Sequence, residues 1–398
     1  MVRTWVTIGA MAALLLGADS GWSVAQETQP VKKQRRILYN CDGCSVMFLK
    51  AGSYKPAELT EADLRQAVDE IAGPGSQVDT WLICVNAQVM YYPSRIGTMV
   101  GSLVSAETRK AWPPTTGQWV ENLEGFYARG ADPYATMIDQ ARKKGREVLL
   151  SFRMNDAHID DFLRCRMWKD HPEYRLNLPG EWQKDSALDF GLEPVRDYTF
   201  ALIQEAVQRY DVDGLEMDFN RFPHYFKPGT EKENAARLNE LVQRVRKMLD
   251  EEGLKRKRRL VLAARVPETL AACRAIGLDP VAWNAAKSLD FLTASHFLYG
   301  DPRLPVKEFK EALPGIPVYS CIEYDGKHEY GPPPDYYRKA AASRWATGAD
   351  GIYLFNFLCS REEGDKASEP PFEVLRELGD PKTIATRAST VPSGGNAP

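Results

Sequence analysis

Acidic and polar side chains alternate along one short stretch in the middle of the chain, residues 212–220. Successive side chains of a β-strand point to opposite faces, so Glu216, Asp218 and Asn220 would share one face of such a strand. The other face would carry the apolar residues Leu215, Met217 and Phe219. Two carboxylates on one face are costly to bury. We therefore expect this face to meet solvent or a ligand.

Two carboxyl groups on either side of a glycosidic bond, one protonated and one ionised, can hydrolyse that bond. Asp218 is the first candidate, and Glu323 is the second because it ends a later apolar run. In a barrel the two side chains would face each other across the mouth, close enough to enclose a sugar. Glu268 ends a third run and is an alternative partner, although it follows a proline and could begin a helix, where Glu is favoured.

Eight short runs rich in Val, Ile, Leu, Phe and Tyr are typical of strands buried on both faces. They are residues 36–39, 78–85, 147–152, 212–219, 260–266, 289–297, 317–322 and 351–357. Helical patterns separate them, among them residues 60–71, which begin like a capping box, and residues 193–209, which begin with a proline. Eight strand–helix units at this length predict an α/β fold, the (β/α)8 TIM barrel, rather than an open doubly wound sheet.

The C-terminal ends of the strands surround one pocket in such a barrel, so the polar residues there are interpreted together. Those expected to bind a substrate are Asn40, Asp42, Arg153, Asn155, Asp156, His158, Glu216, Asn220, Arg221, Arg265, His296, Tyr299 and Asn356. Glu216 lies deeper than Asp218, and we expect Arg153 or Arg265 to hold it in a structural or pKa-tuning role. One acid or histidine alone is often only an ion-pair or hydrogen-bond partner. The convergence of many strand ends favours a functional site.

Two connections are unusually long, residues 86–130 after the second strand and residues 154–192 after the third. Long connections in compact domains are usually functional, and both would lie on the C-terminal face. They contain the aromatic residues Tyr91, Tyr92, Trp112, Trp119, Trp168, Tyr174 and Trp182. These rings could stack on sugars, or they could fix the loops to the barrel rim.

The N-terminus has the pattern of an export signal, with a basic residue, an apolar segment at residues 6–16 and small residues before Gln26. The apolar segment is too short to span a bilayer, although a short membrane anchor is the alternative. We predict a signal peptide at residues 1–25, a linker at 26–35, one catalytic barrel at 36–380 and a disordered tail at 381–398. The protein would then be secreted or periplasmic.

Net charge and cysteine content exclude several other classes. The net charge is −3, with both signs interspersed, and nucleic-acid binding would leave a basic footprint. Seven cysteines are too few and too scattered for a disulfide scaffold. The close pair Cys41-Asp-Gly-Cys44 could be a disulfide, half of a metal site or a coincidence. Because no second pair lies nearby and the five histidines are scattered, we expect no metal and no cofactor.

Several segments resemble the secreted barrels called glycosyl hydrolase-like ten, or family-ten-like glycosylhydrolases. The resemblance extends over about residues 36–360. Its motifs are Phe152-Arg-Met-Asn-Asp156, Leu188-Asp-Phe-Gly191 with Pro194-Val-Arg196, Tyr210-Asp-Val-Asp-Gly-Leu-Glu-Met-Asp218 leading to Arg221-Phe-Pro223, and Ala264-Arg-Val-Pro267 followed by Cys273 and Gly277-Leu278. The resemblance implies a barrel that acts on glycosidic bonds, with Asp218 as a site residue.

Two other groups of barrels share the outline of the central strand. In chitinase-like enzymes the strand ends with the acid Glu, and this chain has Asn220 there, which argues against substrate-assisted chemistry. In amylase-like barrels the Asp that matches Asp218 is the nucleophile and the acid comes from strand five, which favours Glu268. Our hypothesis is an exported glycoside hydrolase that degrades a poly- or oligosaccharide. The alternatives are a carbohydrate-binding barrel without turnover and a metal-dependent hydrolase.

Overall fold

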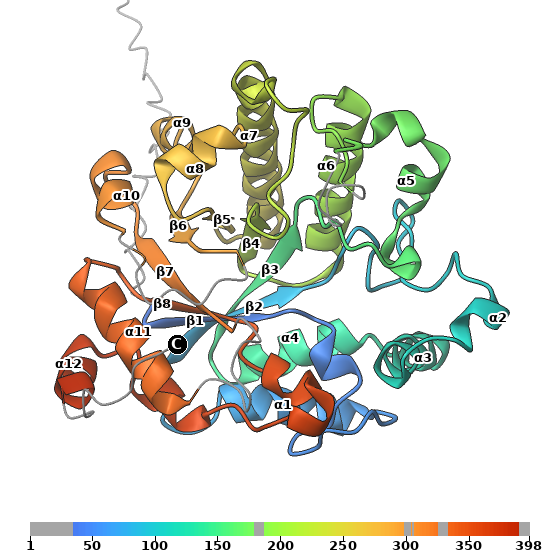
Figure 1. The fold of residues 1–398 in the computed structure, drawn as a ribbon, viewed down its shortest axis with the longest axis horizontal. Helices are drawn as coiled ribbons and strands as arrows, with labels where there is room; N and C mark the ends of the chain where they lie inside the picture. Colours follow the sequence, from blue (N-terminus) through green and yellow to red (C-terminus); the bar gives the residue numbers. More distant parts are fainter. Residues whose placement is uncertain (1–34, 179–186, 298–303, 305, 325–332, 390–398) are drawn as a thin grey trace, which may run out of the picture. The chain divides into compact units, whose positions relative to one another are not determined.

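The fold is described by a computed structural model for residues 35–178, 187–297, 304, 306–324 and 333–389. In this part of the chain eight parallel strands pair in sequence order and close into a barrel (Figure 1). The strands are β1 (Ile37–Cys41), β2 (Val78–Cys84), β3 (Glu147–Arg153), β4 (Gly214–Asp218), β5 (Val261–Val266), β6 (Phe291–Ala294), β7 (Val318–Glu323) and β8 (Ile352–Phe355). The predicted (β/α)8 TIM barrel is confirmed. The expected signal peptide at residues 1–25 lies outside the described residues, as does the linker except for its last residue.

Helices follow the strands and surround the barrel (Figure 1). They are α1 (Glu61–Ile71), α2 (Ala106–Arg109), α3 (Pro114–Ala128), α4 (Pro133–Lys143), α5 (Arg166–Asp170), α6 (Glu193–Arg209), α7 (Glu231–Arg256), α8 (Leu270–Ala275), α9 (Pro280–Ala285), α10 (Lys307–Ala312), α11 (Pro334–Ala346) and α12 (Pro381–Ser389). The predicted capping box at the start of α1 is present, because the Thr60 and Asp63 side chains each bond the other residue's backbone N–H. Among the described residues, no helix is both long and apolar enough to cross a membrane.

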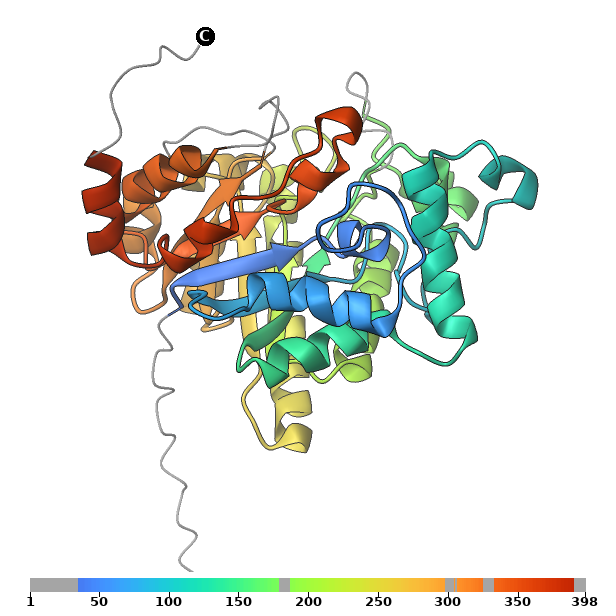
Figure 2. The same cartoon turned by 90° about the horizontal axis from the view of Figure 1, so that it is seen from below.

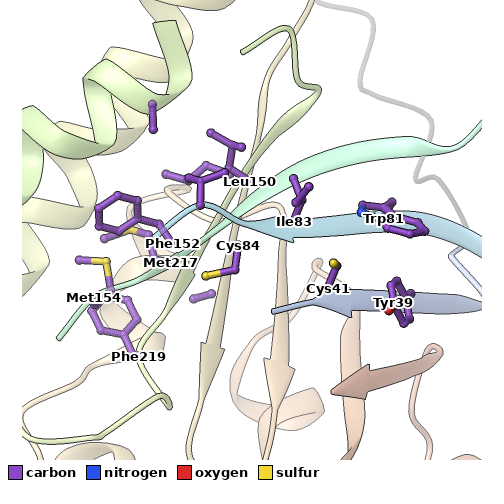
Figure 3. Close-up of a cluster of buried hydrophobic side chains, with 14 of the residues drawn as sticks. Tyr39, Cys41, Trp81, Ile83, Cys84, Leu150, Phe152, Met154, Met217 and Phe219 are labelled. Carbon is purple, nitrogen blue, oxygen red and sulfur yellow. The ribbon is translucent and has the colours of Figure 1, made fainter. Parts of the chain in front are cut away.

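Alternation along the strands separates an outer layer from the barrel interior. Side chains such as Leu150, Phe152 and Met217 pack in the large core that the helices cover (Figure 3). The interior holds a second cluster of strand residues, Leu38, Leu82, Leu149, Ala263, Phe291, Tyr319, Cys321, Tyr353 and Phe355. Glu216 and Asp218 have the interior parity on β4, as the sequence predicted, and pair in register with Ser151 and Arg153 of β3. The acids therefore lie inside the barrel.

The long connections contain more regular structure than predicted. The segment after β2 includes α2 and the 15-residue helix α3, and the segment after β3 includes α5. The aromatic rings predicted to stack on sugars are mostly buried: Tyr91 and Tyr92 are 1% and 0% exposed, and Trp119 and Trp168 at most 9%. Trp112 and Tyr174 pack against the core, and Trp182 lies outside the described residues. These rings fix the loops to the rim, the second of the two interpretations.

The C-terminal tail differs from its prediction as well. Residues 381–398 were expected to be disordered because they are polar, but Pro381–Ser389 form α12. Asp380 stabilises the start of this helix by accepting hydrogen bonds from Thr383, and Ile384 is fully buried. The tail is polar on average, but Ile384 packs into the core of the barrel domain, and the average composition does not reveal this single apolar residue.

The interior near the N-terminal ends of the strands contains a buried ion pair. Arg35 donates from Nε and Nη2 to the two carboxylate oxygens of Glu147 at 2.6 and 2.9 Å, and the Thr80 hydroxyl donates to the same carboxylate at 2.7 Å. The side chains of the pair are only 6% and 8% exposed. Removing one partner would leave a buried charge without compensation, which costs about 3–5 kcal/mol.

We expect Arg35→Met to lower the free energy of unfolding by about 3–5 kcal/mol, measured by urea denaturation. The matched control is Arg36→Met, because Arg36 also contacts a carboxylate, that of Asp79, but its side chain is 42% exposed. An exposed pair contributes about 0–1 kcal/mol. Equal losses for the two variants would contradict the assignment of the buried pair.

Candidate active site

Asp218 ends β4 and is fixed by four hydrogen bonds. Arg265 Nη1 donates to both carboxylate oxygens at 3.1 and 3.0 Å, and the backbone N–H groups of Asn220 and Arg221 donate to Oδ1 at 3.0 and 3.1 Å. The side chain is 1% exposed. The two backbone donors exist because the chain turns directly after the strand. This arrangement is suited to holding a carboxylate at one position.

Arg265, on β5, connects Asp218 with three other strand ends. Its Nη2 donates to Ser295 Oγ at 3.0 Å and lies 3.8 Å from Glu323 Oε2, and its guanidinium lies 3.9 Å from the centre of the Phe355 ring. Burial alone would lower the pKa of Arg265, but the Asp218 carboxylate raises it above its usual value. The arginine therefore stays charged, and the side chains of Asp218 and Glu323 meet on one guanidinium.

Glu216 lies one pleat deeper and is held by hydroxyl groups. Its Oε1 accepts hydrogen bonds from Ser151 Oγ at 2.9 Å and from the Tyr353 hydroxyl at 2.8 Å. Both hydroxyls in turn accept from Asn40 Nδ2, at 3.0 and 2.8 Å. Burial, together with the nearby charge of Asp218, raises the pKa of Glu216 to about 8. Glu216 is therefore a neutral acid at pH 7.

Neither predicted arginine forms an ion pair with Glu216 in the described residues. Arg265 is engaged by Asp218 and Ser295, and Arg153 contacts Asp156. The charge of Arg265 and the two donated hydroxyl groups lower the pKa of Glu216, but burial and the Asp218 charge outweigh them. The pKa-tuning role stays a prediction, but its agents are hydroxyl groups and burial.

A second group of charges lies at the ends of β3 and β4. The Asp156 carboxylate lies 2.6 Å from His158 Nδ1 and 3.3 Å from Arg153 Nη1, and Arg153 also contacts the Tyr91 hydroxyl at 3.4 Å. His158 Nε2 lies 3.4 Å from Arg221 Nη2. Although burial raises the pKa of Asp156, His158 and Arg153 lower it well below its usual range. The structure thus brings together four predicted residues as one polar cluster, namely Arg153, Asp156, His158 and Arg221.

The two predicted amides bind backbone groups of the protein. Asn155 Nδ2 donates to the carbonyls of Leu188 and His224 at 2.9 and 2.6 Å, and its Oδ1 accepts from the Leu188 N–H at 3.0 Å. Asn220 donates in the same way to the carbonyls of residues 295 and 296. Both residues position loops. Because each side-chain NH2 group already donates to two backbone carbonyls, neither can donate to a sugar as predicted.

Glu268 does not join the carboxyl group pair in the described part of the chain. It immediately precedes Thr269, whose side chain caps α8, so Glu268 lies one residue before the N-cap and is not in the first turn of the helix, where the alternative interpretation expected it. Its charge acts on the Cys273 thiol, whose pKa it raises after the larger effect of burial. Among the described residues, no hydrogen bond or ion pair joins Glu268 to Asp218 or Arg265.

The remaining predicted residues fall into two places. The backbone carbonyl of His296 accepts from the Asn220 amide, so this residue borders the Asp218 group. Asp42 and Asn356 line a small cavity of about 10 Å³ between the ends of β1 and β8, which Asn40 also borders. Tyr299 lies outside the described residues.

Sequence reasoning missed four residues that complete the site, namely Ser151, Ser295, Tyr353 and Phe355. Tyr353 and Phe355 could have been found from the alternation along β8, because both lie on the face of this strand that points into the barrel. Ser151 stands opposite Glu216 in the β3–β4 register. These positions follow from the register of a closed barrel, which the sequence does not give directly.

Residues 96–252 match the model of a family described as Glycosyl hydrolase-like 10. This match confirms the resemblance for the motifs around Asp156 and Asp218, whereas the motif at residues 264–267 lies beyond it. A curated relative, the glycosyl hydrolase YngK of Bacillus subtilis (strain 168), is 26% identical over 120 residues, which are 28% of this chain and 23% of that protein. The aligned part therefore spans about a quarter of the relative.

Two solved structures share the fold. The PgaB (BpsB) glycoside hydrolase domain from Bordetella bronchiseptica is 12% identical with a TM-score of 0.56, covering 87% of this chain and 99% of that domain. Alpha-L-fucosidase isoenzyme 2 from Paenibacillus thiaminolyticus is 14% identical with a TM-score of 0.52, covering 89% of this chain and 49% of that one. At such low identity the likeness shows the barrel fold alone.

The raised pKa of Glu216 predicts a pH dependence of stability. The folded protein keeps the proton up to about pH 8, whereas the unfolded chain releases it near its usual value of about 4.3. The stabilisation is complete at low pH and is lost as the pH rises toward 8. Between pH 5 and 8 the wild type should lose at least about 1 kcal/mol more unfolding free energy than Glu216→Gln, which mimics the neutral acid. Parallel urea-denaturation results at the two pH values would contradict the neutral-acid assignment.

Proposed function

We propose that this protein is an exported glycoside hydrolase, which cleaves O-glycosidic bonds of a poly- or oligosaccharide with Asp218 and Glu323. The observation that carries the proposal is the shared contact of both carboxyl groups with the Arg265 guanidinium, at 3.0 and 3.8 Å. The family match supports the reaction class.

Asp218 takes the role of the ionised carboxylate in this proposal. Four donated hydrogen bonds hold it in place, so it can meet the positive charge that develops at the anomeric carbon without first reorganising. Glu323, on β7, donates the proton to the leaving oxygen. Arg265 keeps the two groups at a fixed separation and is a positioning residue.

The polar cluster of Arg153, Asp156, His158 and Arg221 is proposed to orient the sugar beside Asp218 and Glu323. Arg221 follows Asp218 closely in the sequence, and its guanidinium lies 5.0 and 5.9 Å from the rings of Phe222 and Phe355. Among the described residues, its Nε and Nη1 have no hydrogen-bond acceptor. Hydroxyl oxygens of a sugar are acceptors that these two groups could bind.

A specific observation also favours a second candidate, a carbohydrate-binding barrel without turnover. Asp218 and Glu323 are only 1% and 3% exposed, and the Asp218 charge is compensated inside the protein. A barrel that has lost catalysis could keep such a pair for stability. Binding of oligosaccharides measured by calorimetry, without any release of reducing ends, would support this candidate.

We expect Glu323→Gln and Asp218→Asn each to lower kcat on any oligosaccharide that the wild type hydrolyses by about 10²–10⁴-fold. Release of reducing ends from a panel of oligosaccharides is the measurement. Glu268→Gln is the matched control, because it removes the other candidate acid from a strand end, and it should keep wild-type kcat.

Folding of each variant is checked by circular dichroism, because Asp218→Asn leaves the buried Arg265 without its main counter-ion. Glu323→Gln keeps the Asp218–Arg265 pair and therefore separates catalysis from folding. Full activity in folded Glu323→Gln would contradict the proposed pair, and loss of activity in Glu268→Gln alone would transfer the acid role to strand five.

A further inference from the structure

Four metal-binding side chains meet between the loop that follows β1 and the turn that follows β8. Asp42 and Cys44 come from the first segment, and Cys359 and Glu362 come from the 3-10 turn η5 (Cys359–Glu362). The two segments are more than 300 residues apart in the sequence, and Figure 2 shows the red segment after β8 passing beside the blue segment after β1. No metal was expected from the sequence, because Cys41 and Cys44 have no second pair of ligands nearby in the chain.

The spacing of these groups is close to that of a tetrahedral zinc site. Asp42 Oδ2 lies 3.0 Å from Cys44 Sγ and 4.0 Å from Cys359 Sγ. Ligand atoms of Asp42, Cys359 and Glu362 all lie within 4.8 Å of one another. Zinc bonds of about 2.3 Å to sulfur and about 2.0–2.2 Å to oxygen place tetrahedral ligands about 3.3–3.8 Å apart. Asp42, Cys359 and Glu362 are already close to this spacing. Cys44 lies beside Asp42, and its thiol would have to turn toward the other two residues to complete the set.

Asp42 is already oriented for this role. Its Oδ1 accepts hydrogen bonds from the backbone N–H groups of Cys44 and Ser45 at 3.1 and 3.2 Å, which leaves Oδ2 directed at the two thiols. Outer hydrogen bonds of this kind orient ligands and support metal affinity. The Ser45 hydroxyl also contacts the carboxylates of Asp42 and Glu362, and it is the group that an ion would displace.

Among the described residues, no basic side chain forms a hydrogen bond or an ion pair with the cluster, although the charge of Arg153 acts on Asp42 and Cys44. Arg361, next to Glu362 in the sequence, contacts Glu70 and Glu369 instead. A divalent cation would compensate the charge of the carboxylates and of the thiolates that form when it binds. Its binding would release the thiol protons to solvent.

The adjoining space fits an ion better than a sugar. The cavity beside Asp42, Ser45 and Cys359 has a volume of about 10 Å³, far below the range of about 300–1,000 Å³ typical of pockets for organic ligands. The mixture of two thiolates with two carboxylates favours a borderline ion such as Zn²⁺ over the oxygen-binding ions Mg²⁺ and Ca²⁺.

We propose that Asp42, Cys44, Cys359 and Glu362 form a structural Zn²⁺ site that joins the loops after the first and last strands of the barrel. Four protein ligands leave no open position for a substrate, which is the arrangement of structural zinc sites. Asp42 would then act as a metal ligand, in place of the sugar contact predicted from the sequence. The proposal does not depend on the glycosidase assignment.

The test uses the full chain, purified, stripped with a chelator and kept reduced without added thiols. Zn²⁺ is titrated against a chromogenic chelator, and Co²⁺ is added separately to record the thiolate-to-cobalt charge-transfer band. We expect one Zn²⁺ per chain, a cobalt band that shows thiolate ligands, and a higher Tm with Zn²⁺. Affinity should increase with pH because the thiols must lose their protons.

Cys359→Ser and Glu362→Gln should each weaken Zn²⁺ binding at least about 100-fold. The matched controls are Cys273→Ser, which removes a buried thiol of α8, and Glu363→Gln, which changes the exposed neighbouring acid; both should bind like the wild type. Three results would overturn the proposal: no stoichiometric Zn²⁺, unchanged affinity in Cys359→Ser and Glu362→Gln, or a Cys44–Cys359 disulfide that persists in the reduced, zinc-treated protein.

Discussion

The site depends on one buried cation. The side chain of Arg265 is fully buried, and a charge in that position is tolerated only because Asp218, Ser295, Glu323 and Phe355 surround it. These partners come from β4, β6, β7 and β8, so the guanidinium fixes the relative positions of four strand ends. The same contacts bring together two carboxyl groups that lie 105 residues apart in the sequence, which is the geometry that the proposed hydrolysis needs.

The barrel interior contains charged and polar groups at three levels among its apolar side chains. Arg35 and Glu147 form an ion pair near the N-terminal ends of the strands. Glu216, which lies between this ion pair and the C-terminal ends, accepts hydrogen bonds from hydroxyl groups. Asp218 and Arg265 lie at the C-terminal ends. Each level compensates its own charge in a different way. Because Glu216 is neutral at pH 7, it does not compete with Asp218 for Arg265, and that arginine remains available to reach Glu323.

The fold could be predicted well from the sequence because each strand is a separate apolar run and several helices, such as α1 and α6, begin with a recognisable signal. The site could be predicted only in part. Strand parity identified Asp218 and Glu216, but the Arg265 bridge and the Tyr353 contact depend on register across the closed barrel, which no local pattern contains. Glu268 illustrates the limit, because one proline decides that it precedes α8 instead of facing Asp218. The meeting of Cys44 with Glu362 is equally non-local.

A crystal structure of Glu323→Gln with a bound oligosaccharide would test the central claim most directly, since this variant retains Asp218 on Arg265. The account predicts a glycosidic oxygen within hydrogen-bond distance of residue 323 and the adjoining anomeric carbon facing the Asp218 carboxylate. The separation of the two side chains would then indicate retention at about 5–5.5 Å or inversion at about 6.5–9.5 Å. A sugar bound away from Arg265, or with its scissile bond beside Glu268, would contradict the account.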